Sequence, residues 1–339
     1  MFSLPTEVQL DVLKCLNFEQ LFFFRQTNFY LHNLINKYGE GLARKGFYKL
    51  SLTVTKNIHI KSVEPDISEF ILNDQLKGKW EKALVESIPL FLHGVRDDNQ
   101  DIESIAVEML RMRNEAFYFL ILPNIPKTIE EMVIARYWLK QLFKYVFFKY
   151  AEFDGIIFNP KMINLLFDND KTILKQFHVQ HLELGAGNDI DENIFEFALK
   201  HFAIYENLAI VLTQNNIIEK YIDILFNIII NEGNKLPKVY FYIKSSRLYD
   251  RVIEYIATSK DVSNIVPEIV LNCSLLPNFK LNERAEKVEN IRKLGSEFTL
   301  FQISNIYYSK VKFSLWHRDV SYRDESKFLV GIEKMKEQN

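Results

Sequence analysis

The sequence has few of the residues that build disulfide frameworks, flexible linkers or membrane spans. Its two cysteines, Cys15 and Cys273, lie far apart in a chain of 339 residues, which excludes a disulfide framework and a cysteine-based zinc site. Only 11 glycines and 9 prolines occur, so long flexible linkers are not expected. The most apolar segments are too short to span a membrane, and we expect no membrane partner. The first residues lack the pattern of a secretory signal, which predicts a reducing compartment, the cytosol or the nucleus.

A strongly basic balance is also missing. The formal net charge is −2, whereas proteins that bind nucleic acid usually carry a basic face. We therefore expect no nucleic-acid partner. What the chain does have is apolar material: 48% of its residues are hydrophobic, with 28 Phe and 16 Tyr. A chain of this length and composition can bury a sizeable core and form two domains.

Three short helical patterns occupy the first fifty residues. Pro5 or Thr6 can begin the first helix, and Asn17 can cap the second, with Gln20 completing a capping box. Thr27 can cap the third helix. The apolar residues that we expect on the inner faces are Val8, Val12, Leu13, Leu16, Leu21, Phe22, Phe24, Phe29, Leu31, Leu34 and Ile35. Three such helices bury too little surface to be stable alone, so they need a partner or an adjoining domain, and periodicity alone favours a helical cap on a larger domain.

The order of these residues resembles the F-box along its whole length. The resemblance is carried by Leu4-Pro5-x-Glu7-Val8, Leu13-x-x-Leu16, Leu21, Arg25-Gln26-Thr27-Asn28 and Leu34-Ile35. It implies a three-helix module that docks on Skp1 and joins a cargo receptor to a cullin–RING ubiquitin ligase. Carried over by position, Leu4 and Pro5 would insert into the Skp1 groove and Arg25 would lie near its polar rim. The apolar contact would come from Val8, Leu13, Leu16, Leu21 and Phe24. Two positions depart from the family pattern: Tyr30 stands where Trp is frequent, and Gln26 where Val or Cys is frequent.

The remainder of the chain alternates between strand-like and helical patterns. Ser51–Val54 alternates like a strand, and Ile58–Val63 can pair with it. Trp80–Phe91 and Ile102–Leu110 show helical faces, the first ended or kinked by Pro89. Further strands are predicted at Phe117–Leu122, Gly155–Phe158, His181–Leu184, Leu208–Leu212, Val239–Ile243, Ile269–Asn272 and Phe298–Ile303. Helices are predicted between them at Ile129–Phe148, Met162–Phe167, Ile194–Phe202, Ile217–Ile230, Leu248–Ala257 and Ala285–Leu294.

A strand and a helix that recur about every 30 residues are typical of a solenoid. A doubly wound α/β domain would also alternate in this way, but no phosphate loop follows the first strand. This stretch is similar to irregular leucine-rich repeats, through the L-x-L pattern of Leu182-Glu183-Leu184 and through Asn272 after Ile269-Val270-Leu271. Lys310–His317 is expected to close the array as a hairpin with Phe298–Ile303. The predicted fold class is therefore α+β/α/β, a three-helix F-box followed by an irregular β-α repeat solenoid.

Four segments follow from these patterns. Residues 1–50 form the F-box, 51–114 a mixed connecting region packed on the repeats, 115–320 the β-α repeat domain that binds cargo, and 321–339 a charged tail. This layout resembles the divergent F-box families expanded in nematodes, in which the C-terminal region is taken to select cargo. The cargo-binding residues themselves do not follow from the sequence.

The sequence contains no convincing set of catalytic residues. Gly185-Ala186-Gly187 lacks the third glycine of a dinucleotide fingerprint and fits a strand-to-helix turn. His178 and His181 are expected on opposite faces of a strand, where they cannot share a metal. Cys15 fits helix packing rather than a nucleophile. Tyr137–Tyr145 fits an amphipathic helix rather than a stacking surface for nucleic acid. We expect no catalytic residue, no cofactor and no metal.

Three functions remain open. The first is a non-catalytic substrate-recognition adaptor of a Skp1-cullin-F-box ubiquitin ligase, with Skp1 bound by the F-box and an unidentified protein substrate by the C-terminal region. The second is a structural or regulatory protein that binds Skp1 outside any ligase. The third is an enzyme or nucleotide binder with a helical cap, which would require a deep pocket with convergent titratable groups.

Overall fold

The computed structural model describes residues 4–55, 72–93, 102–111, 117–168, 170, 173–186, 193–212, 215–243, 245–274, 281, 283–293, 296–319 and 327–335. The chain divides into two compact units. The first comprises Met1–Glu152, Ile156–Val179 and Glu192–Ala203, and the second comprises Phe153–Gly155, Gln180–Asp191 and Ile204–Asn339. The predicted strand at Ile58–Val63 lies outside the described residues.

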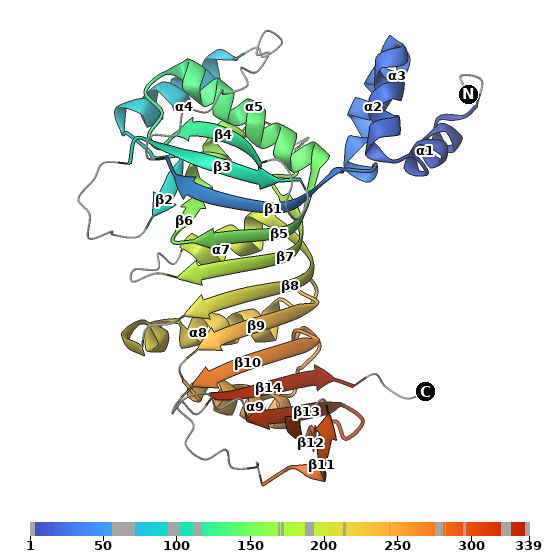
Figure 1. The fold of residues 1–339 in the computed structure, drawn as a ribbon, viewed down its shortest axis with the longest axis vertical. Helices are drawn as coiled ribbons and strands as arrows, with labels where there is room; N and C mark the ends of the chain where they lie inside the picture. The colour runs from blue at the N-terminus through green and yellow to red at the C-terminus, as the bar shows by residue number, and fades with distance from the viewer. Residues whose placement is uncertain are drawn as a thin grey trace. The chain divides into compact units, whose positions relative to one another are not determined.

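Three helices open the first unit (Figure 1): α1 (Thr6–Lys14), α2 (Phe18–Thr27) and α3 (Phe29–Tyr38), followed by the 3-10 turn η1 (Gly39–Gly41). The predicted capping box of α2 is confirmed, because the side chains of Asn17 and Gln20 each accept the other's backbone N–H at 2.9 Å. The predicted cap of α3 is wrong. Asn28, not Thr27, accepts the Leu31 N–H at 2.9 Å, since α2 continues through Thr27.

A four-stranded part of the main sheet follows in the first unit. Strand β1 (Lys45–Val54) pairs in parallel with β5 (Val146–Asp154) and antiparallel with β3 (Ser104–Leu110), and β3 pairs antiparallel with β4 (Phe117–Pro123). The helical face predicted for Ile102–Leu110 is therefore wrong. Ile105, Ala106 and Val107 are all fully buried, so β3 is covered on both faces and shows no alternation that would identify a strand.

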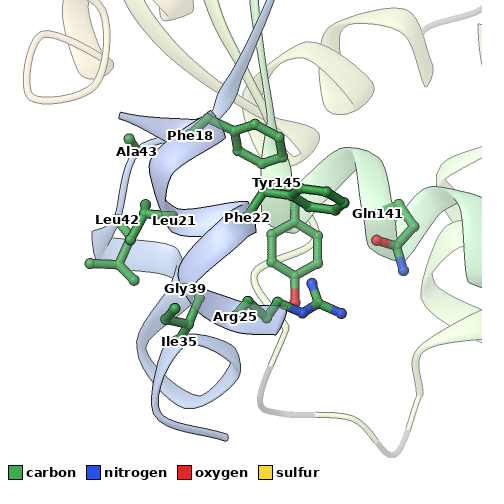
Figure 2. Close-up of a pocket in the computed structure, with 10 residues that line it drawn as sticks. All are labelled: Phe18, Leu21, Phe22, Arg25, Ile35, Gly39, Leu42, Ala43, Gln141 and Tyr145. Carbon is green, nitrogen blue, oxygen red and sulfur yellow. The ribbon is translucent and has the colours of Figure 1, made fainter. Parts of the chain in front are cut away.

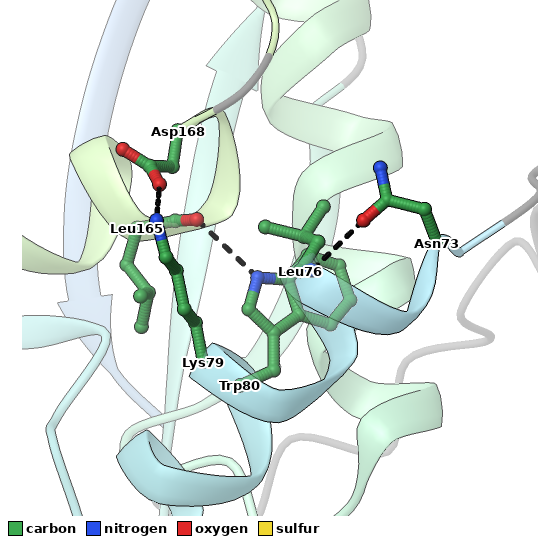
Figure 3. Close-up of polar contacts among 6 residues, drawn as sticks. All are labelled: Asn73, Leu76, Lys79, Trp80, Leu165 and Asp168. Atoms are coloured by element: carbon green, nitrogen blue, oxygen red, sulfur yellow. Dashed lines mark hydrogen bonds and ion pairs between the residues drawn. The ribbon is translucent and has the colours of Figure 1, made fainter.

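The first unit also contains α4 (Asp74–Val85), α5 (Ile129–Tyr145), α6 (Pro160–Leu166), α7 (Asn193–His201) and the pair β2 (Phe91–His93) and β6 (Ile156–Phe158). Figure 3 shows how α4 joins α6: the fully buried Trp80 donates its indole N–H to the Leu165 carbonyl at 3.3 Å, and Lys79 pairs with Asp168. The helix predicted over Trp80–Phe91 ends early, because Ser87 has a φ of 52° and Pro89 cannot continue a helix.

Parallel strands alternate with helices in the second unit. Strands β8 (Phe202–Leu212), β9 (Lys238–Ile243) and β10 (Glu268–Ser274) pair in parallel, and α8 (Asn215–Asn231) and α9 (Arg247–Thr258) connect them. Figure 1 shows both helices against one face of these strands. Val239, Phe241 and Ile243 are buried at alternate positions of β9, as expected for residues that share one face. Strand β7 (Phe177–Ala186) contributes residues to both units.

Antiparallel strands complete the second unit. Strand β14 (Lys327–Lys334) pairs with β10 and with β13 (Lys312–Asp319), and β13 pairs with β12 (Ser296–Ser304), which confirms the predicted hairpin. Strand β11 (Glu286–Lys293) pairs with β12, so the helix predicted at Ala285–Leu294 is wrong. The segment expected to be a charged tail contains β14, which buries Phe328, Val330 and Ile332.

The predicted fold class, an F-box followed by a repeat solenoid, is wrong. The strands form a mixed sheet of twelve in the order β11-β12-β13-β14-β10-β9-β8-β7-β5-β1-β3-β4, and a separate pair β2-β6. Together with the nine α-helices of the described residues, this is a fold dominated by its sheet. The predicted alternation of strands and helices is correct for β8–β10. A period in the sequence, however, does not show that antiparallel strands extend the sheet at both ends.

Candidate docking surface on the N-terminal helices

Residues 4–42 contain helices α1–α3 and the turn η1, and we call them the N-terminal helical module. The module has a small core of its own. Six buried residues form it, with Leu10, Leu16, Phe24 and Tyr38 packed against them: Leu13, Leu21, Leu31, Leu34, Ile35 and Leu42. At least one of these residues comes from each helix. The module is therefore held together by its own apolar contacts, and its remaining apolar side chains are available for other contacts.

Those remaining side chains are exposed to an unusual extent. Among the described residues, 7 of the 20 large hydrophobic side chains that are exposed belong to the module. We call this set the N-terminal apolar surface: Leu4, Val8, Val12, Phe22, Phe23, Phe29 and Tyr30. Leu4, Val8 and Val12 are spaced by four residues, so the two valines lie on the same side of α1. Apolar groups concentrated in so short a stretch mark an interaction site more often than a free surface.

The eight residues that the F-box resemblance assigns to Skp1 divide into three groups. Leu4, Pro5 and Val8 are exposed and can contact a partner directly. Leu13 and Leu21 are buried in the core of the module, against which Leu16 and Phe24 are partly buried. Arg25 is partly exposed, and its guanidinium lies 5.7 Å from the centre of the Tyr145 ring.

Sequence reasoning missed part of this surface. Phe29 was expected in the core but is 80% exposed, and Phe23, which received no role, is 66% exposed. The run Phe22-Phe23-Phe24 could have predicted an exposed phenylalanine. Successive residues point about 100° apart around a helix, so three neighbours cannot all face one core.

Two hydrogen bonds fix the start of the module. Gln9, which is buried, donates its side-chain N–H to the Leu4 carbonyl at 2.7 Å. Its side-chain oxygen accepts the Tyr30 hydroxyl at 2.8 Å, which joins α3 to α1. Tyr30, at the position where the F-box pattern that the sequence resembles often has tryptophan, thus orients α1. The segment containing Leu4 and Pro5 is anchored to that helix through Gln9.

The module is attached to the end of α5. Tyr145 donates its hydroxyl to the Asn36 side chain at 3.2 Å, and the Lys144 ammonium donates to the Asn36 carbonyl. Figure 2 shows Phe22 and Arg25 directed toward Tyr145. These three residues line a cavity of about 160 Å³. Burial raises the pKa of Tyr145, while the charge of Arg25 opposes that shift.

Metal ligands, apolar helices and the cysteines offer no alternative site among the described residues. Three or more metal-ligating side chains do not converge anywhere in the described residues, and the helices found there include none long and apolar enough to cross a membrane. Cys15 is exposed, and its thiol lies 3.3 Å from the Asp11 carbonyl. Burial raises the pKa of Cys273 to about 12. Gly185 lies near the end of β7, and Gly187 is outside the described residues.

The two histidines of β7 have separate environments. His181 lies 3.3 Å from the Glu206 carboxylate, whereas His178 is buried with its Nε2 2.9 Å from the Arg44 guanidinium. Burial, with a smaller effect of Arg44, lowers the pKa of His178 to about 4. His178 is therefore a neutral acceptor for the guanidinium.

Stability is expected to depend on pH through His178. The unfolded chain protonates this side chain near pH 6.5, whereas the folded chain resists protonation until about pH 4. The stabilisation is thus complete above pH 6.5 and is lost as the pH falls toward 4, by roughly 3 kcal/mol. Urea unfolding at pH 7 and pH 5 should show about 2 kcal/mol of this loss. His178→Gln should reduce the difference while its side chain still accepts from Arg44. An unchanged pH dependence in the variant would show that other groups, such as His201, whose pKa burial also lowers, are responsible.

Comparison with known proteins gives a match over part of the chain. No curated protein and no solved structure shows significant similarity to it. Residues 61–213 match the family model described as a domain of unknown function (DUF8381). That range is less than half of the chain and begins after the N-terminal helical module. Over these residues the chain is therefore similar to a domain whose description gives no activity.

Proposed function

We propose that this protein is a substrate-recognition adaptor of a Skp1-cullin-F-box ubiquitin ligase. The N-terminal helical module binds Skp1, and the residues after it bind a protein cargo without catalysing a reaction themselves. The observation that carries the proposal is the N-terminal apolar surface. Helices α1–α3 bury one set of apolar residues in their own core and expose a second set that includes Leu4 and Val8, two positions that the F-box resemblance assigns to Skp1.

The geometry of the module supports this role. A docking element must present its apolar side chains in a fixed arrangement, because ordering them at the moment of binding would cost affinity. The capping box of α2, the cap of α3 and the Gln9–Tyr30 hydrogen bond provide that order. Such a ligase works in the cytosol or the nucleus, which is the compartment that we propose for the chain.

Exposed tyrosines on the second unit suit cargo binding. Tyr205 of β8 is 52% exposed and Tyr242 of β9 is 41% exposed, on neighbouring strands. Tyrosine is enriched at protein interfaces because it offers a large contact area at low entropic cost. We therefore place the cargo contact among the residues that follow the module, with these strands as the first region to mutate.

Capture by Skp1 tests the proposal. Val8→Asp places a charge on the exposed side of α1, and we expect it to weaken Skp1 binding more than about tenfold, because a buried unpaired charge opposes association. Purified full-length chain and immobilised Skp1 give the dissociation constant by surface plasmon resonance. Val85→Asp is the matched control, since Val85 is 86% exposed at the end of α4, outside the module.

Three outcomes would contradict the adaptor role. The first is a wild-type chain that does not bind Skp1. The second is a Val8→Asp variant that binds Skp1 as tightly as Val85→Asp does. The third is a Leu4/Pro5 double-alanine variant that binds Skp1 as tightly as the wild-type chain. Binding that persists without cullin association, or without ubiquitylation of a captured cargo in a reconstituted reaction, would instead establish a Skp1-binding protein that acts outside a ligase.

A further inference from the structure

A second, larger cavity lies in the first unit. Its volume is about 450 Å³, and residues of α2, β1, β3, β4, α5 and β5 line it. Aromatic rings supply much of the wall, chiefly Phe47, Tyr118, Phe119, Tyr137, Trp138 and Tyr145. Cavities of about 300–1,000 Å³ with apolar and aromatic walls and a few polar groups are typical sites for small molecules.

One cation lies in this wall. The Lys45 ammonium is 5.5 Å from the centre of the Phe47 ring and 5.9 Å from that of Tyr118. Lys45 is partly buried, it has no ion pair with the described residues, and no carboxylate lines the cavity. A partly buried ammonium without a counter-charge attracts an anion more strongly than a fully solvated one.

The indole ring of Trp138 also lines this wall. Its N–H has almost no accessible surface, so this donor lies behind the wall and does not face the cavity. The charge that favours an anion in the cavity therefore comes from Lys45.

We propose that the cavity binds a free hydrophobic monocarboxylic acid. Its ring or chain packs among the aromatic side chains, and its carboxylate lies at the Lys45 ammonium. The volume is about three times the ~150 Å³ that accommodates one benzene ring, which leaves room for two fused rings or a medium-length chain. A cationic ligand is disfavoured, because the ammonium of Lys45 already occupies the faces of two rings that would bind it.

The binding site does not depend on the proposed role with Skp1. Lys45 belongs to β1, after the module, and it is not among the residues of the N-terminal apolar surface. A failure of the acid to bind would therefore leave Skp1 binding untouched, and a failure of Skp1 binding would leave the cavity in place. The two proposals can be tested separately in the same preparations.

Calorimetric titration of the full-length chain with 2-naphthoate and with 2-naphthamide tests the site. The two probes share the fused rings, and only the first carries a charge. We expect the acid to bind at least about tenfold more tightly, since hydrogen bonds to charged groups are the stronger ones. Lys45→Met should remove this preference and leave the affinity for the amide nearly unchanged.

Lys149→Met is the matched control. The Lys149 ammonium also lies over two rings, 6.0 Å from that of Tyr48 and 5.6 Å from that of Tyr150, but it does not line the cavity. Met109→Trp, a substitution at a lining residue that fills the cavity, should abolish binding of both probes while circular dichroism confirms that the variant folds.

Several results would overturn the proposal. Equal affinities for the acid and the amide, absence of binding by both, or a preference that survives in Lys45→Met would each exclude a carboxylate at Lys45. A peptide that ends in phenylalanine and binds when the free acid does not would assign the cavity to a protein terminus, which would also overturn the free-acid assignment.

Discussion

Replacing Arg136 with alanine is expected to lower the free energy of unfolding by about 3–5 kcal/mol, because it removes one partner of a buried ion pair. The guanidinium of this α5 residue lies 2.9 Å from the Asp170 carboxylate and donates to the Leu166 carbonyl at the end of α6. It also lies 4.6 Å from the centre of the Phe167 ring. Burial lowers the pKa of Arg136, and the charge of Asp170 opposes that shift.

Urea unfolding followed by circular dichroism measures this effect. The double variant Arg136→Ala/Asp170→Asn should be less destabilised than the sum of the two single variants, since the groups interact directly. Lys79→Ala is the control, because it breaks an ion pair at the same end of α6 whose side chains are 43% and 41% exposed. A loss for Arg136→Ala no larger than that for Lys79→Ala would show that the buried pair does not stabilise this region.

Trp80→Ala is expected to lower the free energy of unfolding by about 3–5 kcal/mol, since it leaves a large cavity between α4 and α6. Trp80 is fully buried. Trp80→Phe should cost less, about 1–2 kcal/mol, because it fills most of the space and removes one hydrogen bond. The Leu165 carbonyl also accepts the Asp168 N–H at 3.4 Å, so we expect it to keep one donor in that variant.

Thermal and urea unfolding of the three proteins give the comparison. Val85→Ala provides a control on the same helix, since Val85 is 86% exposed and its truncation should change the free energy of unfolding by less than about 0.5 kcal/mol. If Trp80→Ala and Val85→Ala were equally stable, α4 would not contribute to the core of the first unit.

The elements that were predicted correctly are marked by patterns within their own residues. The capping box of Asn17 and Gln20 fixes the start of α2. The apolar run Val239–Ile243 identifies β9, because short runs of β-branched and aromatic residues are typical of strands. The elements that were predicted wrongly have patterns that do not match their structure. Glu286–Lys293 carries a charge at five of its eight positions and has no buried face, so its pairing with β12 depends on a neighbour that lies elsewhere in the sequence.

The docking surface was predictable only in part, for a related reason. The motif identifies which residues belong to the module, but it does not show which face each side chain takes. Leu13 and Leu21 were assigned to contact with a partner but are buried in the core of the module, whereas Phe29 was assigned to the core but is exposed. The attachment of Asn36 to Lys144 and Tyr145 joins residues more than a hundred positions apart, and no local pattern encodes such a contact.

The exposed strand β11 has a consequence for association between copies of the chain. It ends the strand order, all eight of its side chains are exposed, and its pairing with β12 is interrupted between Glu286 and Glu289. Lys287, at that interruption, has a φ of 51°. An irregular edge strand that carries both signs of charge is a poor template for another strand. The sheet is thereby protected at this edge from the strand-by-strand growth that leads to aggregation.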